Sequence, residues 1–312
     1  MVNSQSISRP KPKQKQHHIW VEATRPKTLL LAFSSILTGT ALAYQQQYFD
    51  AWVAILSLVT ATLLQITANL ANDYGDYING CDTKERQGPI RGIQLGNMTL
   101  LQLRIAIILV TVASILSGIA LIIRANQDYQ DIVAFIFLGL VAIIAAITYT
   151  VGRRPYGYMG FGDISVFIFF GFLAVGGSFY LQAHSLDSSL VLPAAMAGLL
   201  SSAVLNINNL RDMEQDKQVG KNTLIVRIGE RAGKIYHACL ITAAIVCASL
   251  FALRYFKHWY SFLFVLVIPF FIWHIVSVFK SKTPRELNPL LGHMAKLTLL
   301  FNITFSLGLI LP

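Results

Sequence analysis

The chain has 312 residues, of which 54% are hydrophobic and 13% charged, and its formal net charge is +10. A mean hydropathy of +0.56 excludes an ordinary soluble protein, because the apolar residues come in runs of about 20, the length that crosses the hydrocarbon core of a bilayer. The basic residues flank these runs and form no soluble basic face interleaved with aromatics, so we expect membrane lipid and no nucleic acid as a partner.

In chain order, the first 19 residues are rich in Gln, Lys and Pro and predict a disordered basic tail. Residues 20–312 are expected to form one transmembrane domain. No small-residue cleavage site follows its first apolar run, which we interpret as an uncleaved span. Backbone groups in lipid must be hydrogen-bonded internally, which predicts an all-α polytopic membrane protein. The runs indicate about nine helices, near residues 28–46, 50–70, 101–123, 130–150, 163–183, 190–209, 235–254, 259–278 and 291–311.

Lys and Arg residues gather in the N-terminal tail and in the connections after the second, fourth, sixth and eighth spans. The alternate connections are short and contain few basic residues. Because cytoplasmic loops carry an excess of Lys and Arg, the sequence predicts a multi-pass protein with a cytoplasmic N-terminus.

Two polar segments interrupt the apolar pattern at the ends of the second and sixth spans, and we call them the first and second acidic clusters. Carboxylates beside a bilayer are costly and mark function by default. Helical spacing places the members of each cluster on one face. Each cluster begins with Asn and leads into a polar loop, so we expect a duplicated half that places the two across a central cavity open to the cytoplasm. The first contains Asn69, Asn72, Asp73 and Asp76 and continues to Asp82, and the second contains Asn208, Asp212 and Asp216.

Carboxylates gathered in this way require a cation. Mg²⁺ prefers a few carboxylates combined with waters and phosphate oxygens, so two converging carboxylate faces predict a site for a diphosphate held through Mg²⁺. Basic side chains near the clusters can neutralise the phosphates. The candidates are Lys84, Arg86, Arg91, Lys217 and Lys221.

The clusters resemble the NDxxDxxxD and NxxxDxxxD motifs of the UbiA superfamily of intramembrane prenyltransferases, whose nine-helix fold also fits the number of spans. The resemblance runs from about residue 20 to the end and is closest to the 1,4-dihydroxy-2-naphthoate branch. One departure is that Gly80 stands four positions after Asp76, so the last acid of the first motif is displaced to Asp82. The matching segments are Ala23-Thr-Arg-Pro-Lys-Thr28, Asn69-Leu-Ala-Asn-Asp-Tyr-Gly-Asp76, Gly80-Cys-Asp82-Thr83, Gly88-Pro-Ile-Arg-Gly92, Arg153-Arg-Pro155 and Gly160-Phe-Gly-Asp163.

This resemblance implies a Mg²⁺-dependent polyprenyltransferase of menaquinone biosynthesis in the cell inner membrane. Mg²⁺ would bind the diphosphate of an allylic polyprenyl donor and allow its ionisation to an allylic cation. The acceptor 1,4-dihydroxy-2-naphthoate would capture this cation with loss of CO₂, giving demethylmenaquinone and pyrophosphate, while the apolar helices exclude water. The family motifs imply Asp73, Asp76, Asp82, Asp212 and Asp216 as metal ligands, with Asn72 and Asn208 in substrate binding.

Tyr149 lies at the end of the fourth span, and Arg153 and Arg154 follow it. They resemble the tyrosine and basic pair that the family places near the acceptor, where an aromatic face can stabilise the cation and Arg can bind a carboxylate. The alternative is an interfacial Tyr beside topological Arg residues. Arg25 can likewise reach the active site or serve as a snorkelling anchor.

Two other readings stay open. A secondary transporter also places acids near repeat interfaces, but usually at the bilayer midplane, whereas these acids lie at one end beside basic loops suited to phosphate. A UbiA relative with another aromatic acceptor, such as 4-hydroxybenzoate or homogentisate, differs mainly in the acceptor pocket. An assay of product formation with a panel of aromatic acceptors separates these two alternatives from the naphthoate prenyltransferase.

Overall fold

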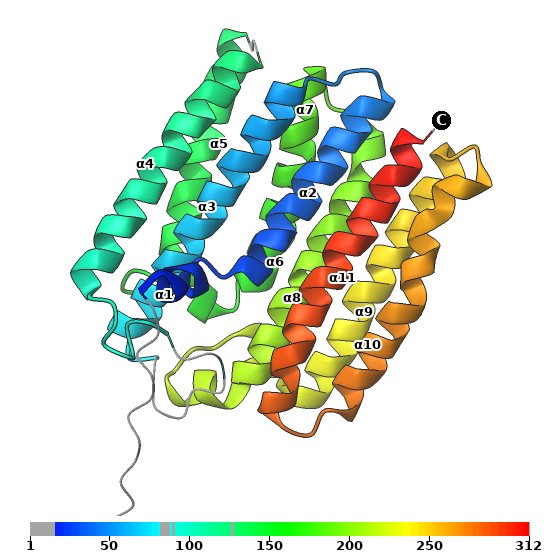
Figure 1. Cartoon of the computed structure of the whole chain (residues 1–312). Helices are drawn as coiled ribbons and strands as arrows, with labels where there is room; N and C mark the ends of the chain where they lie inside the picture. Colours follow the sequence, from blue (N-terminus) through cyan, green and yellow to red (C-terminus); the bar gives the residue numbers. More distant parts are fainter. Residues whose placement is uncertain (1–15, 82–87, 89–90, 126–127, 312) are drawn as a thin grey trace, which may run out of the picture.

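The computed structural model describes residues 16–81, 88, 91–125 and 128–311. Within these residues, nine helices are long and apolar enough to cross a membrane, as the sequence predicts, so the chain is a multi-pass membrane protein. Figure 1 shows them side by side in one bundle, with α4 and α5 at one edge and α9 and α10 at the other. The helical elements are α1 (Gln16–Ala23), α2 (Pro26–Gln45), α3 (Ala51–Ile78), α4 (Leu100–Arg124), α5 (Tyr129–Thr148), η1 (Tyr156–Met159), α6 (Gly162–Val166), η2 (Phe167–Gly176), α7 (Gly177–Ala183), η3 (Ser188–Leu190), α8 (Val191–Gln218), α9 (Leu224–Tyr255), η4 (Trp259–Val267), α10 (Ile268–Lys280) and α11 (Pro284–Ile310).

Three spans are built from consecutive elements. The fifth span, Gly162–Ala183, joins α6, η2 and α7, and η2 winds as a π-helix. The sixth span begins with η3 and continues as α8, and the eighth begins with η4 and continues as α10.

Helices α3, α8 and α9 extend beyond the predicted spans. The first two continue through the acidic clusters to Ile78 and Gln218, because a helix satisfies its backbone equally well outside lipid. Helix α9 begins at Leu224, where the Thr223 hydroxyl accepts from the backbone N–H of Val226 at 3.4 Å. It is interrupted at Gly229, whose φ of 82° is left-handed.

The predicted disordered tail of residues 1–19 overlaps α1, so its last four residues are helical in the structure. Residues 1–15 lie outside the described part. Helix α1 is held by Ile19, which is 2% exposed and packs in a cluster with Leu70 and Leu103. A Cβ added to Gly92 would lie 2.3 Å from the Cγ2 of Ile19, so α1 is pressed against the segment that follows Arg91. Burial of these apolar residues stabilises α1. The polar composition of the tail gives no indication of this helix.

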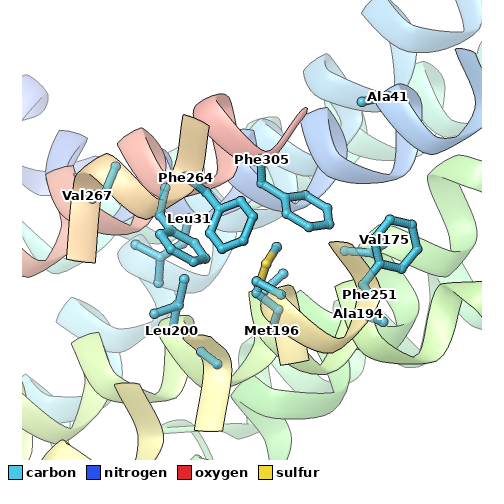
Figure 2. Packing of buried hydrophobic residues seen from close by; sticks show 14 of the residues in the cluster. Leu31, Ala41, Val175, Ala194, Met196, Leu200, Phe251, Phe264, Val267 and Phe305 are labelled. Atoms are coloured by element: carbon cyan, nitrogen blue, oxygen red, sulfur yellow. The ribbon is translucent and has the colours of Figure 1, made fainter. Parts of the chain in front are cut away.

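The largest hydrophobic cluster lies between α2, η2, α8, α9, η4 and α11. Figure 2 shows aromatic rings meeting aliphatic side chains there. Phe251, Phe264 and Phe305 each expose 1% or less of their surface. The rings of Phe251 and Phe305 lie 5.4 Å apart. Tight packing of this kind fixes the positions of α8 and α11, and α8 carries the second acidic cluster.

Glycine allows α2 to approach the fifth span closely. A Cβ added to Gly39 would lie 2.1 Å from the Ser178 Oγ and 2.3 Å from the Val175 carbonyl oxygen. Small residues at such contacts let helix backbones pack together inside a membrane.

Candidate active site

The first acidic cluster occupies the last turns of α3, where Asp73 and Asp76 are each 6% exposed. The helix ends two residues later because Gly80 has a φ of 70°, a conformation that favours glycine. The backbone N–H of Cys81 then donates back to the Asp76 carbonyl at 2.8 Å. This turn keeps the carboxylates facing inward and directs the chain away from them.

Two arginines hold Asp73. Its Oδ1 lies 2.5 Å from the Arg25 guanidinium and 3.1 Å from the Nε of Arg91. Arg25 stands between α1 and α2 with a φ of 50°, unusual for a residue with a side chain. This backbone conformation places Arg25 at the site and supports the active-site alternative over the anchor.

Asp76 contacts three other side chains from separate parts of the sequence. Its Oδ2 lies 2.6 Å from the Arg91 guanidinium, and its Oδ1 accepts a 2.6 Å hydrogen bond from the Tyr158 hydroxyl. The Nζ of Lys221 lies 4.0 Å from the same Oδ1. A buried carboxylate needs this degree of pairing to stay ionised.

The second cluster lies at the end of α8. The Arg211 guanidinium binds both oxygens of Asp212, through Nε to Oδ1 at 2.7 Å and Nη2 to Oδ2 at 2.6 Å. Nη2 also donates to the Asn208 Oδ1 at 2.8 Å. This fork restrains Asn208 and Asp212 together on one helix face.

Lys221 joins the two clusters. Its Nζ lies 3.5 Å from the Asp216 Oδ1 as well as 4.0 Å from Asp76. A second link is the Gln215 side-chain amide, which donates to the Cys81 carbonyl at 2.5 Å. The clusters therefore meet at one end of the bundle, and the predicted convergence is confirmed. We call this end, which holds Asp76 and Asp216, the acidic end.

Lys221 and Tyr158 both stay protonated in this setting. Burial disfavours the charged form of Lys221, but the carboxylates of Asp76 and Asp216 outweigh burial and raise its pKa. Burial and the neighbouring Asp76 carboxylate raise the pKa of the Tyr158 hydroxyl. The ammonium of Lys221 lies 5.1 Å from the centre of the Tyr158 ring. The site thus offers a fixed cation and a fixed hydrogen-bond donor between its acids.

The sequence profile of the UbiA prenyltransferase family matches residues 32–300. The chain belongs to the UbiA prenyltransferase family.

Individual members of the family share much of the sequence. The chain is 52% identical over 295 residues to the 1,4-dihydroxy-2-naphthoate octaprenyltransferase of Haemophilus influenzae, covering 94% of this chain and 96% of that protein. It is 51% identical over 292 residues to the Escherichia coli protein of the same name, covering 94% and 95%. A UbiA homologue from Archaeoglobus fulgidus, solved bound to DMAPP and Mg²⁺, has the same fold, with a TM-score of 0.56, 14% identity and coverage of 92% and 99%.

The donor atoms of this UbiA site suit Mg²⁺, which prefers carboxylate and amide oxygens to nitrogen or sulfur. Asp216 also suits a cation, because its buried Oδ2 accepts no hydrogen bond from the part of the chain that the structure describes. Elsewhere the carboxylates are paired with Arg and Lys, and no group of three His, Cys, Asp or Glu side chains in the described ranges converges closely enough to hold a metal. The carboxylate and amide oxygens therefore fit Mg²⁺ chemically. To bind the ion, the aspartates would have to give up some of their contacts with Arg and Lys.

The other predicted site residues lie in three different situations. Asp82, Lys84 and Arg86 fall outside the described residues. Asn72 is close to the site, where its side-chain oxygen accepts from the Thr150 hydroxyl at 3.1 Å and its carbonyl from Arg91 at 3.4 Å. The structure leaves three basic candidates exposed, namely Arg153, Arg154 and Lys217.

Tyr149 packs beside the site on the ring of Tyr156, with centroids 5.3 Å apart and planes nearly perpendicular. A Cβ added to Gly162 would lie 2.7 Å from the Tyr149 hydroxyl, so the phenol end points at the start of α6. Burial raises the pKa of this hydroxyl, and it stays neutral at any physiological pH.

Sequence reasoning missed two residues of the site. Tyr158 lies in the short η1 segment after Arg154, and no periodicity links it to Asp76, so only the fold reveals the contact. Arg211 lies within the second cluster, where the excess of basic residues in that connection favours a topological role for it. Its position directly before Asp212 and three after Asn208 was the available signal, because a helix brings i, i+3 neighbours together.

Proposed function

We propose that this chain transfers a polyprenyl group from an allylic polyprenyl diphosphate to 1,4-dihydroxy-2-naphthoate, releasing pyrophosphate and CO₂. The single observation that carries the chemistry is the meeting of two buried acidic helix ends around Lys221, with Arg25 and Arg91 beside them. The choice of acceptor is supported by the names of relatives that share 51% or more of the sequence. Those names also favour an octaprenyl donor.

Asp73, Asp76, Asp212 and Asp216 would hold Mg²⁺ against the diphosphate. When bound, the ion neutralises the charge that develops on the leaving group. Arg91 and Lys221 then bind phosphate oxygens from the protein side, because both already lie among the carboxylates. Tyr158 keeps Asp76 oriented throughout, since its hydroxyl does not titrate near neutral pH.

The reaction balances without an oxidant. The allylic C–O bond breaks heterolytically, and its electron pair leaves on pyrophosphate. A ring carbon of the acceptor forms the new C–C bond, and cleavage of the carboxylate as CO₂ returns an electron pair to the ring. Prenyl transfer and loss of CO₂ together consume no net proton, so demethylmenaquinone leaves in its quinol form.

The acceptor would lie toward Tyr149 and the Arg153–Arg154 pair. The apolar helices around the site exclude water, which would otherwise trap the allylic cation. The aromatic face of Tyr149 suits a delocalised cation, and guanidinium groups suit the acceptor carboxylate. Both arginines are exposed, so their contact with the acceptor would form on binding.

We place the protein in the cell inner membrane with its N-terminus and acidic end on the cytoplasmic side. The support is the distribution of basic residues, since Arg and Lys gather in the connections at the acidic end. The secondary-transporter alternative is not favoured, because both relatives at this identity are named as transferases.

The test is product formation by the purified protein in lipid vesicles with Mg²⁺ and octaprenyl diphosphate. The acceptor panel contains 1,4-dihydroxy-2-naphthoate, 4-hydroxybenzoate and homogentisate, and the acceptor carboxyl carries ¹³C. We expect labelled CO₂ and a prenylated naphthoquinol only with the first acceptor. A prenylated benzoate that keeps its carboxyl would assign the chain to another acceptor, and no product with any acceptor would refute the transferase.

A further inference from the structure

A groove opens on the outer face of the bundle between α9 and α10, away from the acidic clusters. Its volume is about 430 Å³, and it is lined along α9 from Ile235 to Val246 and by Phe279 of α10. In Figure 1 these helices lie at the edge of the bundle, with α10 outermost. Its size is within the range of small-ligand sites, about 300 to 1,000 Å³.

The lining of the groove is largely apolar and its outer side is open. Small side chains form part of the lining, where Ala238 and Thr242 stand one helical turn apart beside Ala243. Larger side chains flank them, and Ile235 is 48% and Phe279 46% exposed. A hydrocarbon chain suits such a groove, because it needs no polar partners and gains contact with the apolar side chains of both helices.

One end of the groove is basic. The Lys234 ammonium donates to the Ser281 carbonyl at 2.7 Å, which ties the start of α9 to the end of α10. Arg231 precedes Ile235 by one turn, and Lys280 follows Phe279 directly, so both exposed side chains lie at that end. They face the same side of the bilayer as the acidic end, since α8 and α9 are joined there by only five residues.

The acids near this end are occupied by other contacts. Glu230 pairs with Lys234 at 2.6 Å. Glu286 accepts from the Lys282 backbone N–H and from the Thr283 hydroxyl, each at 2.9 Å. Among the residues that the structure describes, these two carboxylates are engaged elsewhere, so Arg231 and Lys280 can meet an anion from outside the protein.

We propose that the groove binds an anionic phospholipid, with one acyl chain between α9 and α10 and its phosphate against Arg231 and Lys280. Basic residues beside a membrane attract anionic headgroups. The groove supplies the apolar half of the same molecule. A second copy of the chain fits less well, because a two-fold axis along the membrane normal would bring the two basic ends together.

The test compares two lipids with identical chains, dioleoylphosphatidylglycerol and dioleoylphosphatidylcholine, by native mass spectrometry of the full chain. We expect one phosphatidylglycerol to stay bound at several-fold lower concentration than phosphatidylcholine. The double variant R231Q/K280Q removes this preference, and Ala243→Phe, which places a bulky ring in the lining of the groove, weakens binding of both lipids. The matched controls lie on and beside the same helix but outside the groove: Lys257→Gln for charge and Leu253→Phe for bulk, and neither changes binding.

A second measurement needs no variant. Cys239 lines the groove and is exposed, whereas Cys81 is buried and Cys247 partly so. Phosphatidylglycerol should slow the labelling of Cys239 by an apolar maleimide several-fold, and phosphatidylcholine should not. Equal retention of the two lipids, or labelling that neither lipid changes, overturns the proposal. Loss of a dimer in Ala243→Phe would instead assign the groove to a second copy.

Discussion

The Tyr158 hydroxyl donates a 2.6 Å hydrogen bond to the Oδ1 of Asp76, the same oxygen that lies 4.0 Å from the Lys221 ammonium. The same hydroxyl accepts from the Cys81 thiol at 3.2 Å. Tyr158 comes from the connection after α5, so this contact ties a third segment of the chain to the two acidic helices. Asp76 is thereby held in one orientation before any substrate arrives.

Replacing Tyr158 by Phe should slow the reaction. A hydrogen bond to a charged group contributes about 1.5 to 3 kcal/mol, and about 1.4 kcal/mol corresponds to tenfold in rate. We expect kcat/KM to fall tenfold or more in steady-state assays. The matched control is Tyr180→Phe, which loses a 2.7 Å bond to Asp131 at the opposite end of the bundle. Equal losses in both variants would indicate a general effect on stability.

Asp76→Asn and Asp212→Asn should abolish turnover while the protein stays folded. An amide keeps the shape of the side chain but lacks the charge that holds Mg²⁺ against a diphosphate, which is worth several kcal/mol, or roughly 100-fold or more in rate. Pyrophosphate release measures the effect. Glu214→Gln is the control, because this exposed carboxylate lies on the same helix between Asp212 and Asp216. Retained activity in either Asp variant would refute the metal assignment.

Lys221→Gln should destabilise the protein equally at neutral and moderately alkaline pH. Loss of a buried ion-pair partner costs on the order of 3 kcal/mol. The pKa of Lys221 is raised above its ordinary value of 10.5, so its contribution is complete below that value and is lost only as pH rises through the higher folded pKa. The difference in Tm from the wild type should therefore stay constant between about pH 7 and 9. A difference that shrinks across this range would mean that Lys221 titrates normally.

Arg153→Lys or Arg154→Lys should raise the KM for the acceptor. Lys preserves the charge that sets topology but lacks the planar fork that binds a carboxylate, a difference of about 1.5 to 3 kcal/mol or roughly tenfold or more in KM. The KM for the donor should hardly move. Acceptor values unchanged in both variants would return the pair to a topological role, and a raised donor value would assign it to the diphosphate.

Gly39→Ala should destabilise the bundle because its Cβ would lie 2.1 Å from the Ser178 Oγ. Overpacking of this kind costs about 1 to 3 kcal/mol. Gly139→Ala is the matched control, since that helical glycine of α5 has open space around it and Ala favours a helix. A lower Tm in detergent for Gly39→Ala alone confirms the close contact.

Much of this architecture follows from the sequence. Hydropathy predicts all nine spans found in the described ranges, because backbone groups in lipid must be hydrogen-bonded within helices. The acids of the two clusters are recognisable as functional residues because an unpaired charge beside a bilayer is energetically unfavourable. Their meeting through Lys221 confirms the expected convergence, whereas the duplicated half stays a prediction.

What the sequence conceals is long-range or local geometry. The contact of Tyr158 with Asp76 joins residues 82 positions apart and depends on how η1 is folded. Arg25 reaches Asp73 only because its backbone adopts a φ of 50°, which no composition signals. The predicted central cavity also stays a prediction, since the groove between α9 and α10 and the pocket near Asp50 and His184 both lie away from the acidic clusters.

The placement of α1 bears on how the protein should be produced. Helix α1 leads directly into Arg25, and Ile19 and Gln16 anchor it, the latter by donating to the Asn97 carbonyl at 3.2 Å. Helix α11 ends at the opposite end of the bundle from α1 (Figure 1). A purification tag or fluorescent fusion attached after residue 312 therefore leaves the ion pair of Arg25 and Asp73 undisturbed. A bulky fusion placed shortly before Gln16 would instead disturb α1, the helix that positions Arg25.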